Sequence, residues 1–350
     1  MLLGATSKMP QTLLTTANLA IGYANRILLQ ELNLQLQAGT ITVLLGRNGI
    51  GKSTLIRTLA GLQPALKGSV RIGERLLIPR RNYEWLARQI AVTLTERPHA
   101  PFMTGYELVA LGRAPYTNWT GRLTPTDHQQ IERALSITDA DELRNCPIEE
   151  LSDGQCQKLM IARAIAQDTP LLLLDEPLAH LDLANSAQLL CHLTEYVRAT
   201  GKAILMSTHQ IELAIHKADF IWLIDQHNRL HSDMPEQLVL DNQIGDIFSG
   251  RQVFFNHFTG YFNFLPPNAA RTIAACLHMS ENSSYWLAQA FAKKGIRLLH
   301  KENAKWHIRQ VHSSPHRFEC QANEHIFETN VAGVVQLMLE QASLPELANF

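Results

Sequence analysis

The sequence contains no block of like charge, no long apolar run and no recognisable leader. Its 31 basic and 32 acidic residues nearly cancel over 350 positions, which argues against a charged surface that binds nucleic acid or an anionic membrane. No apolar stretch approaches the ~18 residues of a membrane-spanning helix, and the N-terminus lacks the basic flank and apolar core of a signal peptide. We therefore expect a protein without membrane spans that is not secreted.

Paired cysteine spacings are absent too. The five cysteines are odd in number and scattered along the chain: Cys146, Cys156, Cys191, Cys276 and Cys320. This pattern is typical of reduced, buried thiols in a cytosolic protein. The chain also contains no internal repeat and no low-complexity segment.

The first 249 residues carry the patterns of an α/β domain. Alternating apolar residues from Leu13 to Leu36 predict a half-buried antiparallel sheet. Capping-box spacings at Thr104 and Thr124 predict a helical insertion over about 98–165. From residue 170 onward, short apolar strands separated by helices predict a buried, mainly parallel core sheet. We therefore expect one large domain at 11–249.

The pattern changes after Gly250, and we expect a separate small α+β domain at 250–350. We predict a strand at Thr272–Leu277, a helix from about Ser284 to Gly295, strands near 296–300, 305–312 and 317–321, and a final helix with Val331, Val334, Val335 and Met338 on one face. This domain is rich in histidine: His257, His278, His300, His307, His312, His316 and His325. His312 and His316 flank a short turn and could share a metal ion, but no tight ligand spacing with Cys or Asp/Glu supports this, and exposed histidines on short strands are the favoured explanation. A dimer contact or a regulatory role is the other hypothesis.

Residues 46–54 fit the phosphate-loop pattern G-x-x-x-x-G-K-[ST], between a buried strand at Ile41–Leu45 and a helical apolar stripe. Glycines let backbone N–H groups point at phosphate oxygens, and the helix N-terminus adds positive potential. Lys52 is expected to reach the β- and γ-phosphates, and the Ser53 hydroxyl to hold Mg²⁺. The predicted nucleotide contacts are Gly46, Arg47, Asn48, Gly49, Gly51, Lys52, Ser53 and Thr54. The protein is therefore expected to bind a nucleoside triphosphate.

Two further strings fit a nucleotide site. The apolar strand Leu171–Leu174 ends in two carboxylates, of which Asp175 could orient Mg²⁺ and Glu176 could polarise an attacking water. Without the phosphate loop, such residues could simply cap the next helix. Ser152 precedes a helical pattern and offers a second phosphate-binding surface, although alone it would more often be an ordinary N-cap.

The order of these strings resembles the ATP-binding cassette family over about residues 13–245: a phosphate loop, Leu-Ser-x-Gly-Gln at 151–155, the strand that ends in Asp175 and Glu176, and Ser-Thr-His at 207–209. The resemblance implies a P-loop NTPase cassette with an antiparallel β subdomain and a helical insertion. It also implies a head-to-tail dimer that encloses two ATP molecules with Mg²⁺. In such a dimer, Ser152, Gly154 and Gln155 of one copy would contact the γ-phosphate that the other copy binds.

The same resemblance assigns three more residues. Tyr23 would stack on adenine, although an isolated tyrosine could equally serve packing. His209 would hydrogen-bond the γ-phosphate and help to hold the water and Glu176. Asp182 belongs to the segment that crosses the dimer interface. With Lys52, Glu176 and His209 as the catalytic residues, we predict an active ATPase.

The sequence departs from the family pattern at two positions. Asp153 stands where the segment Leu-Ser-x-Gly-Gln at 151–155 usually has its first glycine. Since a carboxylate beside the γ-phosphate would repel it and the neighbouring Gly154 is kept, we expect the Asp153 side chain to point to solvent. Glu96 stands where a glutamine usually follows the strand before the insertion. It could still ligate Mg²⁺ through oxygen, or it could form a surface ion pair with Arg97.

Residues 106–116, followed by Gly-Arg-Leu at 121–123, resemble the cassette ATPases of iron-complex importers. This implies an ATPase subunit that drives uptake of a siderophore, haem or related chelate. Its partners would be a polytopic permease and, indirectly, an extracytoplasmic binding protein, with no nucleic acid involved. It would lie peripherally on the cytoplasmic face of the inner membrane. Phe102, Met103 and Tyr106 could contact the permease or pack inside the insertion, whereas Leu108, Val109 and Leu111 are expected to be core. The alternatives are a soluble non-transport cassette ATPase and an exporter subunit.

Overall fold

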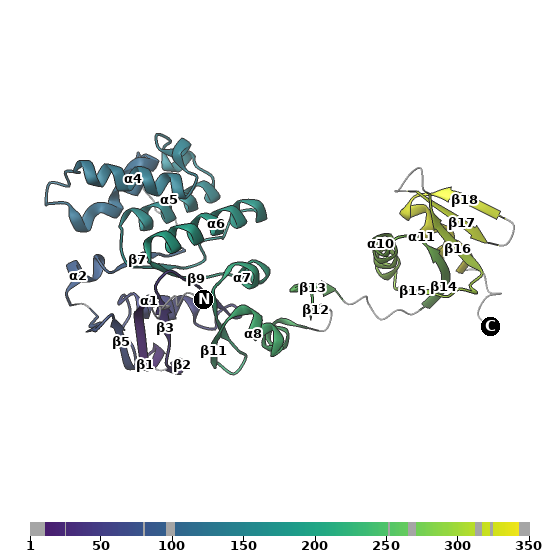
Figure 1. Ribbon diagram of the computed structural model, residues 1–350, viewed down its shortest axis with the longest axis horizontal. Helices are drawn as coiled ribbons and strands as arrows, with labels where there is room; N and C mark the ends of the chain where they lie inside the picture. Colours follow the sequence, from purple (N-terminus) through teal and green to yellow (C-terminus); the bar gives the residue numbers. More distant parts are fainter. Residues whose placement is uncertain are drawn as a thin grey trace, which may run out of the picture. The chain divides into compact units, whose positions relative to one another are not determined.

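The computed structural model describes residues 11–24, 26–79, 81–95, 102–250, 253–264, 271–311, 317–322 and 325–342. The chain divides into two compact units (Figure 1). The first comprises Met1–Phe248 with Asn256–Tyr261, and the second comprises Ser249–Phe255 with Phe262–Phe350. Each unit has its own hydrophobic core. Among the described residues, no helix is long and apolar enough to cross a membrane.

An antiparallel sheet forms one part of the first unit, as the alternation predicts. Its strands are β1 (Thr12–Tyr23), β2 (Arg26–Leu32), β3 (Gln35–Gln37), β5 (Lys67–Ile72) and β6 (Arg75–Leu76). They run in the order β2-β1-β5-β6, and β3 also pairs with β1. Pairs such as Leu19 and Ile21 of β1 and Val70 and Ile72 of β5 enter the core together, because residues two apart in a strand point to the same face.

The second sheet of this unit is mainly parallel. Its order is β11-β10-β4-β9-β8-β7, formed by β4 (Ile41–Leu45), β7 (Ile90–Thr93), β8 (Leu171–Leu174), β9 (Ala203–Ser207), β10 (Phe220–Ile224) and β11 (Leu230–Asp233). Only β11 runs antiparallel to its neighbour. The strands β4, β8 and β9 are buried along their whole length and are almost entirely apolar, because both of their faces are covered. Their carboxyl ends lie at one edge of the sheet, where ligands of such folds bind.

Helices fix the position of this edge. The helices α1 (Lys52–Leu59), α2 (Tyr83–Ala87), α6 (Leu183–Thr200), α7 (Ile211–Lys217), α8 (Pro235–Leu240) and α9 (Gln243–Phe248) connect or follow the strands. Leu55, Ile56 and Leu59 of α1 are fully buried in the core that both sheets share. Burial of each such side chain contributes about 1.5–3 kcal/mol to the stability of the fold. This packing fixes the position of α1, whose N-terminus follows β4 in the chain.

The predicted helical insertion contains α3 (Gly105–Ala110), α4 (Pro125–Ile137) and α5 (Asp153–Ala166), with 3₁₀ turns at Leu111–Tyr116, Asp141–Leu143 and Ile148–Glu150. In Figure 1, α4 and α5 lie at the opposite end of this unit from β1 and β5. Both predicted capping boxes, at Thr104 and Thr124, are confirmed. The expectation that Leu111 is core was wrong, since its side chain is 49% exposed. At this residue the chain tightens from an α-helix to a 3₁₀-helix, which changes the direction of the side chains.

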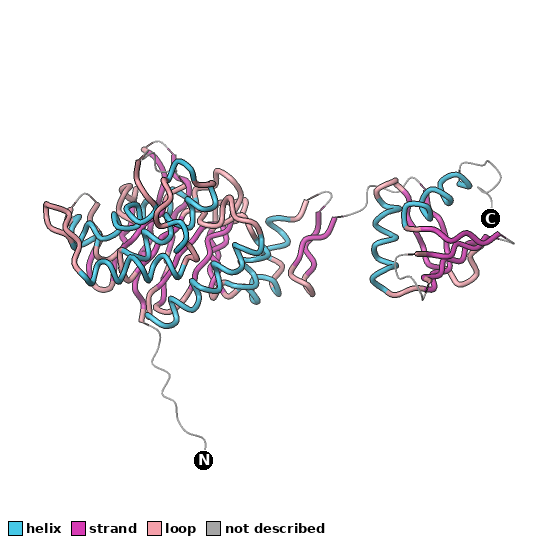
Figure 2. The backbone as a smooth tube through the Cα atoms, turned by 90° about the horizontal axis from the view of Figure 1, so that it is seen from above, coloured by secondary structure: helices cyan, strands magenta, loops and turns pink. Residues whose placement is uncertain are grey.

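The second unit contains a five-stranded sheet in the order β15-β14-β16-β17-β18. Its elements are β14 (Arg271–His278), α10 (Glu281–Ala292), β15 (Ile296–His300), β16 (Trp306–Gln310), β17 (Phe318–Ala322), β18 (His325–Thr329) and α11 (Val331–Ala342). Figure 2 shows α10 and α11 (cyan) on one side of the strands (magenta), and residues of both helices join one core with alternate residues of the sheet. A hairpin of β12 (Val253–Asn256) and β13 (Tyr261–Phe264) precedes it. The histidines His312 and His316 lie outside the described residues.

Candidate nucleotide site

The loop between β4 and α1 has the backbone that a phosphate loop needs. Gly49 and Gly51 adopt φ angles of 74° and 118°. Glycine is favoured in this region because it has no Cβ, which in other residues would clash with the backbone. Gly51 is the N-cap of α1 and has no side chain to cap it. The amides of the first helical turn are therefore left for an anionic ligand, and the helix dipole favours negative charge at this point.

Lys52 brings a positive charge to the inside of this loop. Its side chain is buried, and Nζ donates to the carbonyl oxygens of Gly46 at 2.9 Å and Arg47 at 3.3 Å. Burial lowers the pKa of the Lys52 ammonium, while the negative charges of Glu176 and then Asp175 act to raise it. The carboxylates of Glu176 and Asp175 therefore favour the protonated, positively charged form of Lys52.

A cavity of about 510 Å³ joins the loop to segments that are distant in sequence. It is lined by Tyr23, Arg26, Leu28, Asn48, Gly49, Gly51, Lys52, Ser53, Thr54, Glu176 and His209. The expected contacts Gly46 and Arg47 do not line it, and the Arg47 guanidinium instead donates to the Ile247 carbonyl at 3.0 Å. A larger hollow of about 710 Å³ runs along β2 and β11 but contains no phosphate loop.

Sequence reasoning missed two residues of this cavity, Arg26 and Leu28. Both belong to β2, whose first residue, Arg26, pairs with Tyr23 across a tight turn. Because β1 and β2 form a hairpin, a residue just after Tyr23 returns to the same site. The alternation of these strands was visible in the sequence, but it did not reveal which side chain faces the loop.

Tyr23 is placed at the open rim of the cavity. Its side chain is 58% exposed, and its hydroxyl is 3.4 Å from Oγ1 of Thr54 in α1. An exposed aromatic ring that is tethered at its hydroxyl offers a flat apolar surface beside the phosphate loop. This arrangement can receive a planar base.

The end of β8 holds a buried carboxylate. Oδ1 of Asp175 accepts a hydrogen bond from the Ser207 hydroxyl at 2.6 Å, and Oδ2 accepts one from Thr95 at 3.4 Å. The same Ser207 oxygen accepts a hydrogen bond of 2.9 Å from the backbone N–H of Glu176. One hydroxyl of β9 thus fixes both the carboxylate of Asp175 and the backbone that follows it.

These oxygen donors suit a hard cation. Ser53 is exposed in the first turn of α1, and Asp175 supplies a carboxylate in the same unit. Mg²⁺ prefers such oxygen ligands together with water and substrate phosphates. The third predicted metal ligand, Glu96, lies outside the described residues.

Glu176 and His209 form a pair at the edge of the cavity. Glu176 Oε1 lies 2.6 Å from His209 Nε2, so an ionised carboxylate there requires the proton on Nε2. The backbone of Glu176 has φ = 52°, a conformation that costs non-glycine residues about 1–3 kcal/mol and persists where surrounding contacts enforce it. The hydrogen bond from Glu176 N to Ser207 is one such contact. The pair can hold a general base in one orientation.

The signature segment lies elsewhere in the unit. Ser152 caps α5 in a capping box with Gln155, with hydrogen bonds of 3.3 and 2.9 Å. A Cβ on Gly154 would lie 2.8 Å from the carbonyl oxygen of His180, so only glycine fits here without movement. Asp153, at the first position of α5, is exposed.

Asp182 follows this contact along the chain and caps α6. Its carboxylate accepts hydrogen bonds from the backbone and side chain of Asn185 at 2.8 and 2.9 Å, and these bonds lower its pKa. None of the four residues predicted to act across a dimer lines the cavity of the single chain: Ser152, Gly154, Gln155 and Asp182. The structure therefore presents two separate surfaces, the nucleotide cavity and the signature segment.

Comparison with known proteins identifies relatives of the first unit. The model of the ABC transporter family matches residues 29–179. An uncharacterised ABC transporter ATP-binding protein of Methanocaldococcus jannaschii is 36% identical over 250 residues, which are 71% of this chain and 86% of that protein. The achromobactin transport ATP-binding protein of Dickeya dadantii is 37% identical over 240 residues, 68% of this chain and 88% of that protein. The iron(3+)-hydroxamate import ATP-binding protein of Bacillus subtilis is 39% identical over 202 residues, 57% of this chain and 74% of that protein.

Solved structures share the fold. A putative metal-chelate type ABC transporter in an inward-facing conformation superposes with a TM-score of 0.60 and 25% identity, and the match covers 73% of this chain and 98% of that one. A dimeric bacterial ABC transporter cassette superposes with a TM-score of 0.57 and 21% identity, covering 63% of this chain and 98% of that one.

Proposed function

Because this chain belongs to the ATP-binding subunits of ABC transporters, we propose that it couples ATP binding and hydrolysis to uptake of an iron complex through a membrane permease. The cavity that joins the phosphate loop to Glu176 and His209 carries the enzymatic part of this proposal. The proposed class of cargo, an iron complex, is supported by relatives whose names specify achromobactin transport and iron(3+)-hydroxamate import.

ATP binds with its phosphates on the loop amides and its base on Tyr23. Lys52 is released from the Gly46 and Arg47 carbonyls to pair with the β- and γ-phosphates, a charge-assisted contact that replaces neutral ones. Ser53 and Asp175 would hold Mg²⁺, which would neutralise phosphate charge when bound. Arg26, which lines the same cavity, adds a second cation near the nucleotide.

Glu176 acts as the general base that accepts a proton from the attacking water. His209 keeps the Glu176 carboxylate oriented, and His209 can itself donate to the γ-phosphate once ATP is present. Asp175 and Glu176 have different roles. Asp175 is buried and accepts a hydrogen bond from Ser207, so it suits metal binding, whereas Glu176 lines the cavity and can reach the water. Protonation of Glu176 would stop this step.

A second copy of the chain completes the site. Ser152, Gly154 and Gln155 at the start of α5 lie outside the cavity of their own chain, and a head-to-tail partner would bring them to the γ-phosphate. A helix N-terminus with a serine side chain suits a phosphate. ATP then bridges two copies, so its binding favours the closed dimer, and hydrolysis followed by product release favours the open one. Permease segments attached to each copy would move with this cycle.

The permease would be contacted through the helical insertion. Phe102 is 93% exposed just before α3, so of the three predicted contacts it is the one that offers a large apolar side chain to a partner. Met103 and Tyr106 are partly buried, and the Tyr106 hydroxyl lies 2.5 Å from Nδ1 of His128. Attachment through this surface would hold the ATPase peripherally on the cytoplasmic face of the membrane.

Co-purification tests this proposal. A tagged chain expressed in its native organism should co-purify with a polytopic permease after detergent extraction of the membranes. The purified complex, reconstituted in vesicles with a binding protein, should take up a ferric siderophore and hydrolyse ATP faster when the chelate is present. The same complex made with the Glu176→Gln variant is the negative control and should not take up the chelate. A fully active homodimer in the soluble fraction, with no membrane protein attached, would contradict the transport function.

A further inference from the structure

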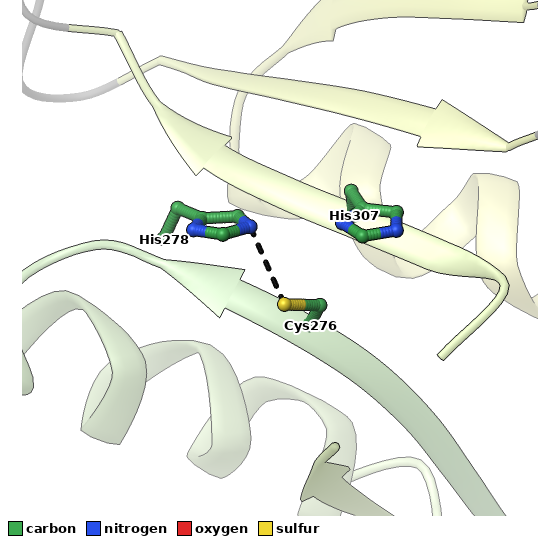
Figure 3. Close-up of side chains that lie close together, drawn as sticks. All are labelled: Cys276, His278 and His307. Atoms are coloured by element: carbon green, nitrogen blue, oxygen red, sulfur yellow. Dashed lines mark hydrogen bonds between the residues drawn. The ribbon is translucent and has the colours of Figure 1, made fainter. Parts of the chain in front are cut away.

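Three potential metal ligands gather on the sheet of the second unit, outside the nucleotide site. Cys276 and His278 lie on β14, and His307 lies on the neighbouring strand β16 (Figure 3). The Cys276 sulfur and one nitrogen of each imidazole all lie within 4.8 Å of one another. Cys276 Sγ is 3.3 Å from Nε2 of His278. The two imidazole rings stack, with centroids 5.9 Å apart and 11° between their planes.

The register of the sheet accounts for this cluster. Strands β14 and β16 are parallel, and Cys276 stands opposite His307. His278 follows Cys276 by two residues and therefore points to the same face. The intervening side chains enter the core with α10 and α11, as Ala275 and Ile308 do. All three ligands thus lie on the face that the helices leave uncovered, and two hydrogen-bonded strands hold them in place.

The donor set is selective for one kind of ion. A thiolate and two imidazoles suit borderline or soft transition metals, whereas Mg²⁺ and Ca²⁺ prefer oxygen ligands. With Zn–S near about 2.3 Å and Zn–N near about 2.0–2.1 Å, a tetrahedral ion keeps its ligand atoms roughly 3.3–3.7 Å apart. For a sulfur–nitrogen pair these bond lengths give roughly 3.5–3.6 Å, so the observed 3.3 Å between Cys276 Sγ and His278 Nε2 needs only a small adjustment. Both histidines are exposed, so their rings can close the remaining separations by rotation.

We propose that Cys276, His278 and His307 form a three-ligand site for a thiophilic divalent metal ion, with Zn²⁺ the ion that the donors fit best. Loading deprotonates the Cys276 thiol, and the proton passes to solvent. Cys276 is buried, whereas both histidines are exposed. Three protein ligands leave a fourth position that can take water or a further ligand. This proposal rests on the second unit alone and does not depend on ATP hydrolysis or on the transported cargo.

Metal titration of the full-length chain tests the site. The protein is freed of metal, kept reduced with a phosphine, and titrated with Co²⁺ without nucleotide. The wild type should bind one equivalent of Co²⁺ with thiolate charge-transfer absorption and strong visible bands, and one equivalent of Zn²⁺ should remove both. Cys276→Ser should abolish the charge-transfer band. His278→Gln and His307→Gln should each weaken Zn²⁺ binding at least tenfold, since even the loss of an outer-shell partner costs about 10–100-fold.

Two matched variants serve as controls. His227→Gln removes an exposed histidine of the first unit, and Cys191→Ser removes a thiol of the same unit; neither belongs to the cluster, so both should bind Zn²⁺ like the wild type. Circular dichroism in the presence of a chelator should be the same for all variants, which excludes misfolding as the cause of lost binding. The proposal is overturned if the wild type binds no stoichiometric Zn²⁺, or if binding persists in all three ligand variants because the contact is only a thiol–imidazole hydrogen bond.

Discussion

Replacement of Glu176 by glutamine separates ATP binding from ATP hydrolysis. The amide has nearly the shape of the carboxylate, and its oxygen can still accept the hydrogen bond that His209 Nε2 gives at 2.6 Å. What is lost is the basic oxygen that takes a proton from water. Loss of a general base typically slows a reaction about 10²–10⁴-fold, which corresponds to roughly 3–5 kcal/mol in the activation free energy.

ATP binding should survive the change. The phosphate loop and Lys52 are untouched, and the Glu176 charge acts on Lys52 only as a secondary influence after burial. The Kd for ATP should therefore stay within a few-fold of the wild type, while kcat falls by at least about a hundredfold. Since the bridging nucleotide is no longer hydrolysed, the variant should also accumulate as a dimer in ATP with Mg²⁺.

The assay is phosphate release at saturating ATP, combined with isothermal titration and analytical ultracentrifugation. Glu195→Gln, an exposed carboxylate on α6, is the matched control and should behave like the wild type in all three measurements. Undiminished phosphate release in Glu176→Gln would refute the general-base assignment. Equal loss of binding and turnover would show that Glu176 holds the nucleotide and does not act on the water.

Three further predictions concern other parts of the first unit. Tyr23→Ala should raise the Kd for ATP by at least about fivefold in titrations, because base stacking contributes roughly 1–3 kcal/mol, whereas Tyr23→Phe should stay within a few-fold. Gly154→Ala should leave nucleotide binding by the monomer unchanged but lower turnover roughly 5- to 100-fold through overpacking, since the new methyl group would lie 2.8 Å from the His180 carbonyl oxygen; normal turnover would contradict it. Arg113→Met should lower the free energy of unfolding by about 3–5 kcal/mol, because it leaves Asp127 buried without the guanidinium at 2.7 Å. Burial acts to raise the pKa of Asp127, but hydrogen bonds from Thr124 and then Arg113 outweigh it and hold the pKa at about 2; the stabilisation is therefore complete above about pH 4 and lost as the pH falls towards 2, and the acid-unfolding midpoint of Arg113→Met should move to higher pH.

Local sequence patterns were sufficient for most of the fold. The phosphate loop, the apolar strands of the core sheet and the capping boxes of the insertion depend on neighbouring residues, and each was visible in the chain. In the second unit, β15 at Ile296–His300 matches the predicted strand, whereas α10 begins at Glu281, three residues before the predicted start, because Ser280 provides the N-cap. The strand β18 was missed, since a short edge strand with no long apolar run carries little periodic signal.

Contacts across distant segments could not be read from the sequence. Ser207 belongs to a predicted motif, but its bridge between Asp175 and the Glu176 amide depends on the pairing of β8 with β9. Cys276 and His307 are far apart in the chain, and only the parallel register of β14 and β16 places them side by side. Strand register across a crossover is set by the packing of the whole sheet, and hydrophobic periodicity within one strand does not encode it.

The shared hydroxyl of Ser207 makes positions 175 and 176 epistatic. Any substitution that moves the Asp175 carboxylate also shifts the oxygen on which the next backbone amide depends. Single variants at these two positions should therefore give losses that do not sum in the double variant. A change at Asp175 or at Ser207 therefore also alters the support of the Glu176 backbone, so Asp175 and Ser207 should be inherited and engineered together.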